Sequence, residues 1–232
     1  MTEQELKHEA REIVRLFKNK EVTDEEIICR IKDMPEIIHI KLPSTANLFL
    51  ESVLSNRFQI TKVLVEMGSD IHLKCKPSLI AGNVLNVAHS SEQADYLLGL
   101  GIEIEKNISM KEDFVNPLIM AVQHNQKDMV FYWLHKQKVL FAEDEEFIKE
   151  LICATIYQIT IMNQWDMIAC IMADDELYPI MKDIYSEKND ISSIKLVLAS
   201  LRRIKEEALE SKKKELRKIL NERKKKLEVM EA

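Results

Sequence analysis

Glycine and proline are scarce in this chain, with four Gly and five Pro among 232 residues. A fold rich in β-sheet needs turn residues at the end of each strand, so this scarcity argues against one. Leu, Ile, Glu, Lys and Met dominate instead, and all of them except Ile are strong helix formers. The composition therefore predicts an all-α fold.

The chain also lacks a long apolar run. The longest uncharged run, 151–165, has 15 residues and includes Thr, Gln and Asn, whereas a membrane-spanning helix needs about 20 apolar residues. The amino-terminal residues are charged and mixed, which argues against a secretory signal peptide. We therefore expect a cytoplasmic protein that does not enter a membrane, in which 151–165 is a buried helix.

Cysteine and histidine form none of the spacings that bind metals. The six His have no H-x-x-x-H or H-E-x-x-H spacing, and C-x-x-C is missing too. Motifs of nucleophilic catalysis and phosphate binding, such as G-x-S-x-G and G-K-[ST], are also missing. We expect no enzyme activity, no cofactor and no metal. We also expect free thiols in the core at the four cysteines, which are Cys29, Cys75, Cys153 and Cys170.

A repeated segment is the most informative feature. NPLIMAVQHNQKDMV at 116–130 matches ATIYQITIMNQWDMI at 154–168, and the N-Q-x-D tetrads of the two copies coincide at an offset of 38. Asn125 suits a helix end that enters the left-handed region, and Asp128 can accept N–H bonds at the start of a second helix. The unit is thus predicted as helix, tight turn, helix. Such units stack because one alone cannot bury its apolar face.

The segment 116–121, Asn-Pro-Leu-Ile-Met-Ala, resembles the T-P-L-H-x-A opening of the ankyrin repeat. Asn125 stands at the Gly of the turn, and Trp133 and Leu134 stand at the Leu pair. Further copies start at Asn47, at Asn83 (with a first helix about three residues shorter) and at Ala154, and a weaker copy starts at Tyr178. The starts from 47 to 154 are 36, 33 and 38 residues apart, near the ankyrin period of 33.

This resemblance to the ankyrin family implies an ankyrin-like helical-hairpin solenoid with a long C-terminal helix. We predict a divergent capping helix pair in 1–43, with helices at 6–18 and 24–33, ankyrin-like repeats in 44–194 and a basic helix in 195–232. Because no copy has the complete T-P-L-H motif, a related helical-hairpin solenoid is the alternative.

The charge is uneven along the chain. Residues 195–232 contain 13 Lys and Arg against 7 Glu, whereas 1–194 contain 20 basic against 32 acidic residues. Since 191–232 has no Pro or Gly, we predict one long helix there, packed on the last repeat at its start. Beyond that, the helix is a solvated extension, a dimerising helix or a basic arm that touches nucleic acid.

The resemblance also implies a non-enzymatic function, in which the concave face of the stack binds another protein as an adaptor or inhibitor. An acidic body favours a basic partner, such as a nucleic-acid-binding protein. The alternative is nucleic-acid binding or dimerisation through the C-terminal helix. Acidic clusters at 143–146 and 174–176 are interpreted as loop and helix-start residues. The contact residues expected from position are Glu51, Lys74, Lys76, Asp113, Phe114, Met120, Gln123, Phe141, Asp144, Glu145, Gln158, Met162, Asp174 and Asp175.

Overall fold

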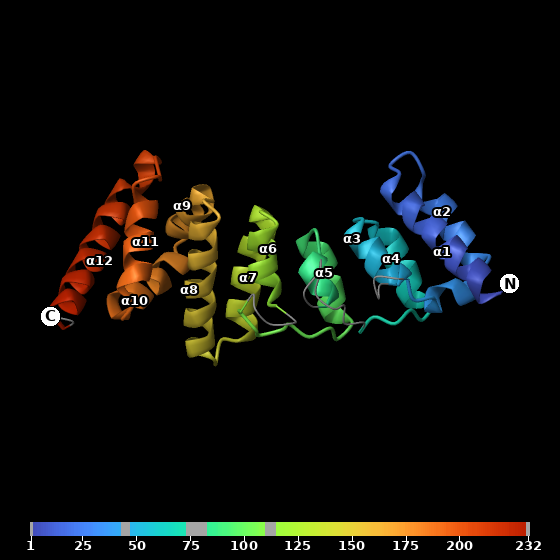
Figure 1. Cartoon of the computed structure of the whole chain (residues 1–232), viewed down its shortest axis with the longest axis horizontal. Coiled ribbons are helices and arrows are strands. Elements are labelled where there is room, and N and C mark those ends of the chain that lie inside the picture. The colour runs from blue at the N-terminus through green and yellow to red at the C-terminus, as the bar shows by residue number, and fades with distance from the viewer. Residues whose placement is uncertain (1, 43–46, 73–82, 110–114, 231–232) are drawn as a thin grey trace. The chain divides into compact units, whose positions relative to one another are not determined.

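The computed structural model describes residues 2–42, 47–72, 83–109 and 115–230, and these residues form helices and connecting segments without a β-strand (Figure 1). The predicted all-α fold is confirmed. The elements are α1 Glu3–Lys18, α2 Asp24–Lys32, the 3-10 helix η1 Pro35–His39, α3 Leu48–Leu54, α4 Phe58–Glu66, η2 Val84–Val87, α5 Ser91–Gly99, α6 Pro117–Gln123, α7 Lys127–Leu140, α8 Glu145–Ile161, α9 Trp165–Ala173, α10 Leu177–Glu187, α11 Ile191–Leu201, η3 Glu207–Leu209 and α12 Glu210–Met230.

The chain divides into two compact units, 1–121 and 122–232. In the first unit the helices come in pairs, and α1 packs against α2 and α3 while α2 packs against α4. The N-terminal pair predicted at 6–18 and 24–33 is present as α1 and α2. Both helices begin with a capping box, Thr2 with Glu5 and Thr23 with Glu26, which satisfies two backbone N–H groups at each start. The three-part division into 1–43, 44–194 and 195–232 stays a prediction.

The asparagines that start three of the repeat copies share one arrangement. The side-chain oxygen of each caps a helix start, with Asn47 accepting from the Leu50 N–H at 2.9 Å. The side-chain nitrogen donates to a loop carbonyl, and Asn47 reaches Asp70 O at 2.8 Å. Asn83 does the same with Leu85 N–H and Glu103 O, and Asn116 with Leu118 N–H and Glu105 O. At this position, Asn therefore caps the helix and also donates a hydrogen bond to a loop carbonyl.

Three further asparagines lie where the repeat predicts tight turns. Asn56, Asn125 and Asn163 have φ values of 53°, 54° and 58°, and they are the described non-glycine residues with positive φ. Asn tolerates this left-handed conformation better than most residues. The prediction for Asn125 is confirmed, and the shortened first helix after Asn83 is confirmed as the four-residue η2. Asp128 lies in the first turn of α7, although no side chain caps that helix.

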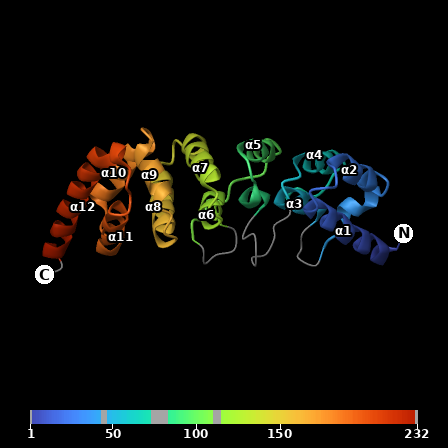
Figure 2. The ribbon, with the colours of Figure 1, turned by 90° about the horizontal axis from the view of Figure 1, so that it is seen from above.

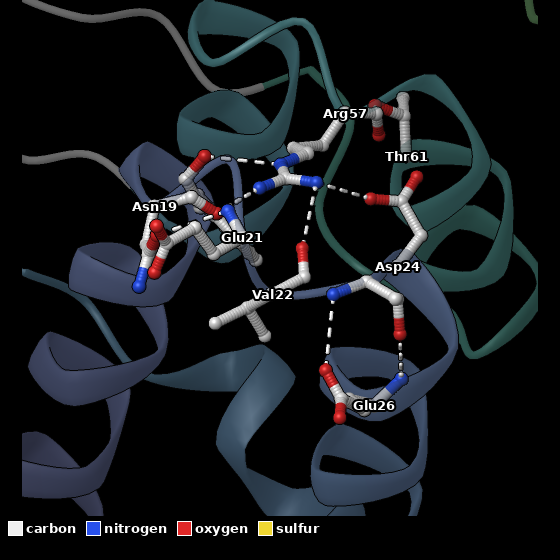
Figure 3. A network of polar contacts seen from close by, with 9 residues as sticks. Asn19, Glu21, Val22, Asp24, Glu26, Arg57 and Thr61 are labelled. Carbon is white, nitrogen blue, oxygen red and sulfur yellow. Dashed lines mark hydrogen bonds and ion pairs between the residues drawn. The ribbon is translucent and has the colours of Figure 1, made fainter.

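Arg57 connects the α3–α4 turn to the α1–α2 loop (Figure 3). Its guanidinium donates to Phe17 O at 3.0 Å, Val22 O at 3.2 Å and Asn19 O at 2.5 Å, and pairs with Asp24 at 2.8 Å. Loop carbonyls that would otherwise lack donors thereby gain partners on a side chain from the next helix pair.

In the second unit, α8 packs against α9, α10 and α11, and α10 also packs against α9. Figure 2 shows α9 and α10 on one side of the neighbouring helices α8 and α11. Large side chains of α7, α9 and α10, including Trp133, Met167, Met181 and Tyr185, fill the core between these layers.

The prediction of one helix over 191–232 is wrong, because the chain turns back after Leu201. The 3-10 helix η3 and α12 follow, and α12 packs against both α10 and α11. The turn buries Leu209, Leu216, Leu220 and Leu227, which a continuing helix would leave in water. The segment after Leu201 therefore contains a helix that is packed into this unit, and it is not a solvated extension.

Candidate binding surface

The acidic residues expected to contact a partner serve the fold in the second unit. Asp144 caps α8 by accepting from the Phe147 N–H at 3.2 Å. Asp174 accepts from the Glu176 and Leu177 N–H groups, both at 2.9 Å, and from His135 Nε2 at 2.9 Å. Asp175 lies 3.2 Å from the Lys212 ammonium. These contacts agree with the interpretation of 143–146 and 174–176 as loop and helix-start residues.

The pKa of Asp174 reflects these partners. Burial alone would raise it, but the N–H groups of Leu177 and Glu176 together with His135 outweigh burial and hold the pKa below its usual range. The carboxylate is therefore bound to this loop as a charged group.

Gln123 and Gln158, two expected contact residues, lie side by side. Gln123 Nε2 donates to Gln158 Oε1 at 3.0 Å, so the end of α6 is tied to α8. Phe141 packs edge-on against Phe147, with ring centroids 5.2 Å apart. Glu145 is exposed. The structure thus brings one pair of the expected residues together at α8.

The other expected contact residues lie elsewhere. Met120 is only 5% exposed, which leaves it without the surface that a contact residue needs. Glu51 on α3 is half-buried, and burial raises its pKa although Lys18 partly offsets this. Lys74, Lys76, Asp113 and Phe114 lie outside the described residues.

An exposed apolar patch lies at the C-terminal end of α8, and of its three residues the sequence indicated only Met162. Tyr157, Ile161 and Met162 are 47%, 46% and 40% exposed, and we call them the α8 patch. Tyr157 and Ile161 are four residues apart and so share one face of the helix. The uncharged run 151–165 could have indicated this patch. A helix that is apolar on all sides exposes apolar side chains unless every side is covered.

A basic row lies along α11 and its C-terminal end. Lys195 is in the helix, Arg202 is its C-cap and Arg203 follows. All three are exposed, as is Ala199 between them, and we call the three cations the α11 basic row. Lys195, Ala199 and Arg202 follow at helical spacings of four and three residues and share one face. The opposite face of α11 is buried through Ile194, Val197 and Leu201, a separation typical of an amphipathic helix.

Helix α11 packs against α8, and two contacts show that the helices run parallel. Lys188 Nζ, just before α11, lies 3.0 Å from Cys153 Sγ, and farther along Ser200 Oγ lies 3.4 Å from Thr160 Oγ1. Exposure alone does not place a residue of α8, because exposed Lys149 and Glu150 line depressions against α10. The α8 patch lies at the other end of the helix, where Ile161 directly follows Thr160 and Arg202 follows Ser200 by two residues. The α8 patch and the α11 basic row therefore lie close together at the contact of Ser200 with Thr160, and we call this surface the α8–α11 face.

A groove lies between α8 and α10 in this unit. It contains depressions of about 360 Å³ and 500 Å³ that share Lys149, and their charged side chains carry both signs. Cys153 lines the larger one.

Cys29, Cys153 and Cys170 are free, as expected, but the expectation of core thiols is wrong because Cys29 is exposed and the other two are half-buried. Cys75 lies outside the described residues.

The basic α12 uses much of its charge within the fold. Lys213 is buried and donates to Ile204 O at 2.7 Å, while Arg217 donates to Leu201 O at 3.0 Å. Arg223 donates to Lys188 O at 2.9 Å. Lys214, Lys218 and Lys225 remain exposed on the outer face of the helix.

Comparisons with known proteins give no further assignment. No protein-family model, no curated protein and no solved structure matches the chain. Within the described ranges, no helix has the length and apolarity to cross a membrane. The same ranges contain no group of three or more His, Cys, Asp and Glu side chains placed to hold a metal ion.

Proposed function

We propose that this chain is a non-enzymatic protein-binding module of the ankyrin-like type, and that it binds its partner through the α8–α11 face. The observation that carries the proposal is the exposure of Tyr157 and Ile161 next to each other on α8. Exposed apolar groups that adjoin one another mark interaction surfaces more often than single ones do. Tyr is also among the residues that dominate binding energy at protein interfaces.

The ankyrin-like assignment is supported by the asparagine positions. Asn47, Asn83 and Asn116 cap a helix start and tie it to a loop, at the place of the first residue of T-P-L-H. Left-handed Asn125 stands where the ankyrin repeat has Gly. A stack of helix pairs presents one helix of each pair on a shared surface, and in this proposal α8 takes that position in the second unit.

Affinity capture with paired variants tests the proposal. The immobilised full chain is compared with Tyr157→Asp/Ile161→Asp, and with Val139→Asp/Leu140→Asp as the matched control. The control residues are exposed apolar residues of α7 in the same unit, 75% and 50% exposed. We expect a set of proteins that both the wild type and the control capture and that the α8 variant loses. Capture of the same set by all three proteins would remove the α8–α11 face from the proposal.

Nucleic-acid binding through α12 is the second candidate function. It is favoured by the exposure of Lys214, Lys218 and Lys225, which lie four and seven residues apart on one face of the helix. Because α12 is packed into the second unit, deletion of 195–232 would expose core residues and would not isolate this function. Charge-reversal variants of these three lysines avoid that problem.

A further inference from the structure

The three cations of the α11 basic row differ from other cations of the second unit. Lys138, Lys182 and Lys212 are paired with Glu176, Glu215 and Asp175, at 2.7, 2.7 and 3.2 Å. In contrast, Lys195, Arg202 and Arg203 make no ion pair with any residue that the structure describes. Three exposed cations within about two helical turns, the last two of them at the C-terminal end of α11, repel each other, and an anionic partner relieves that repulsion.

The dimensions of the α8–α11 face suit a short peptide segment. Tyr157 and Ile161 are about 6 Å apart along α8, and Lys195 and Arg202 are about 10 Å apart along α11, from a rise of 1.5 Å per residue. Neighbouring helices pack about 8–10 Å apart. An apolar strip and a cationic strip therefore run parallel, separated by about the width of one helix.

We infer that the α8–α11 face binds an acidic segment of another protein, whose apolar side chains pack on the α8 patch while its carboxylates pair with the α11 basic row. This inference rests on the proposed function and specifies its partner. The net charge of 1–194 favoured a basic partner, and internal ion pairs such as Asp24 with Arg57 leave that net charge unchanged. The inference of an acidic partner depends instead on the local charge of the α8–α11 face, to which the α11 basic row contributes three cations. The charge at the surface itself is what a bound segment meets.

A protein segment fits this surface better than a nucleic acid. Tyr157 is the one aromatic residue of the α8 patch, and Ile161, Met162 and Ala199 add no second ring on which a following base could stack. Glu150 lies seven residues before Tyr157 on the same face of α8 and is exposed, so it repels any anion on the α8 side of the surface. A peptide can keep its carboxylates on the α11 side, whereas a phosphate backbone carries negative charge along its whole length.

Peptide selection on the full chain tests this inference. A display library of random 16-residue peptides is selected on the wild type, with counter-selection on Tyr157→Asp/Ile161→Asp. Selected peptides are synthesised, and their affinity is measured by fluorescence anisotropy at low and high salt. We expect peptides with negative net charge and two or more large apolar residues, whose affinity falls as salt rises. Basic or neutral peptides, or the absence of any peptide that depends on the α8 patch, would overturn the inference.

Two charge-reversal triples supply the control. Lys195→Glu/Arg202→Glu/Arg203→Glu should weaken binding of the selected peptides by about tenfold or more, from three exposed charge pairs. Lys214→Glu/Lys218→Glu/Lys225→Glu makes the same change in net charge on α12 and should alter affinity less than about twofold. Equal effects of the two triples, or displacement of the peptide by a 16-bp DNA duplex, would overturn the inference. If capture of proteins depends on Tyr157 and Ile161 while the selected peptides are basic, the proposed function stands and only the acidic partner falls.

Discussion

Ser200 Oγ lies 3.4 Å from Thr160 Oγ1 in a buried contact between α11 and α8. This distance is long for a pair of hydroxyls. Each hydroxyl has a nearer acceptor on its own helix, because Ser200 donates to Leu196 O at 3.0 Å and Thr160 donates to Ile156 O at 2.7 Å. Each hydroxyl is therefore satisfied locally, and the pair mainly allows the two helices to approach closely. That approach places the α11 basic row beside the α8 patch.

A larger side chain at this contact should separate the two helices. We expect Ser200→Leu to destabilise the second unit by about 1–3 kcal/mol, because it adds volume to a closely packed interface. Ser200→Ala should cost less than about 1 kcal/mol, because the hydroxyl has a partner on its own helix. Urea unfolding followed by Trp fluorescence reports on this unit, since Trp133 and Trp165 both lie in it. Equal stability of the two variants would mean that the contact is not closely packed.

The left-handed turn at Asn125 predicts a residue-specific effect. Asn125→Ala should lower the free energy of unfolding by about 1 kcal/mol, because a Cβ without a compensating polar group disfavours positive φ. Asn125→Gly should leave stability unchanged within about 0.5 kcal/mol, since Gly adopts this conformation without strain. The same pair of substitutions at Asn163 should give the same order. If Ala is tolerated as well as Gly, the turn does not depend on the left-handed conformation.

We expect Arg57 to stabilise the first unit. Arg57→Ala should reduce the free energy of unfolding by about 2–4 kcal/mol, because loop carbonyls and Asp24 lose a charged donor. Arg57→Lys keeps the charge but not the planar fork of donors, so it should recover only part of the loss. Urea unfolding followed by circular dichroism measures both variants. Full recovery by Lys would show that charge alone matters at this site.

The packing of α12 can be tested with one buried and one exposed residue. Leu220→Ala should destabilise the second unit by about 2–5 kcal/mol, because Leu220 is fully buried. Val229→Ala near the end of the same helix should have an effect within about 0.5 kcal/mol, since Val229 is 78% exposed. A solvated helix would show no difference between the two substitutions in Trp fluorescence.

The lowered pKa of Asp174 predicts a loss of stability in acid. Because the folded pKa lies below that of the unfolded chain, the carboxylate stabilises the fold above the unfolded value, near 3.8, and the stability is lost as pH falls through the folded pKa. Asp174→Asn should therefore destabilise the protein near neutral pH, with a difference that shrinks below pH about 4. Asp175→Asn, at an exposed carboxylate, is the control. A difference that does not change with pH would mean that the charge of Asp174 is not responsible.

The local features of the fold were predictable because they depend on residues close in sequence. Asn125 ends a helix before a second apolar helix, and Thr23 precedes an acidic first turn, so both elements follow from short-range rules. The turn after Leu201 was not predictable from composition, because no Gly or Pro marks it. It arises from the burial of Leu216 and Leu220 against helices more than 15 residues away in sequence.

The candidate surface was only partly predictable for the same reason. Position within the repeat indicated Gln158 and Met162, which lie at the α8–α11 face or next to it. It also indicated Met120, which is buried. The contribution of Lys195, Arg202 and Arg203 depends on α11 lying parallel to α8, and that follows from tertiary contacts at Cys153 and Thr160.

Methyl NMR of the full chain with a selected acidic peptide locates the binding surface. We expect the largest shifts on peptide addition at the methyl groups of Ile161, Met162 and Ala199. Met230 and Val229, exposed near the end of α12, should not move. Shifts at α12 or along the α8–α10 groove, with Ile161 and Ala199 unchanged, would contradict the claim that the α8–α11 face is the binding surface.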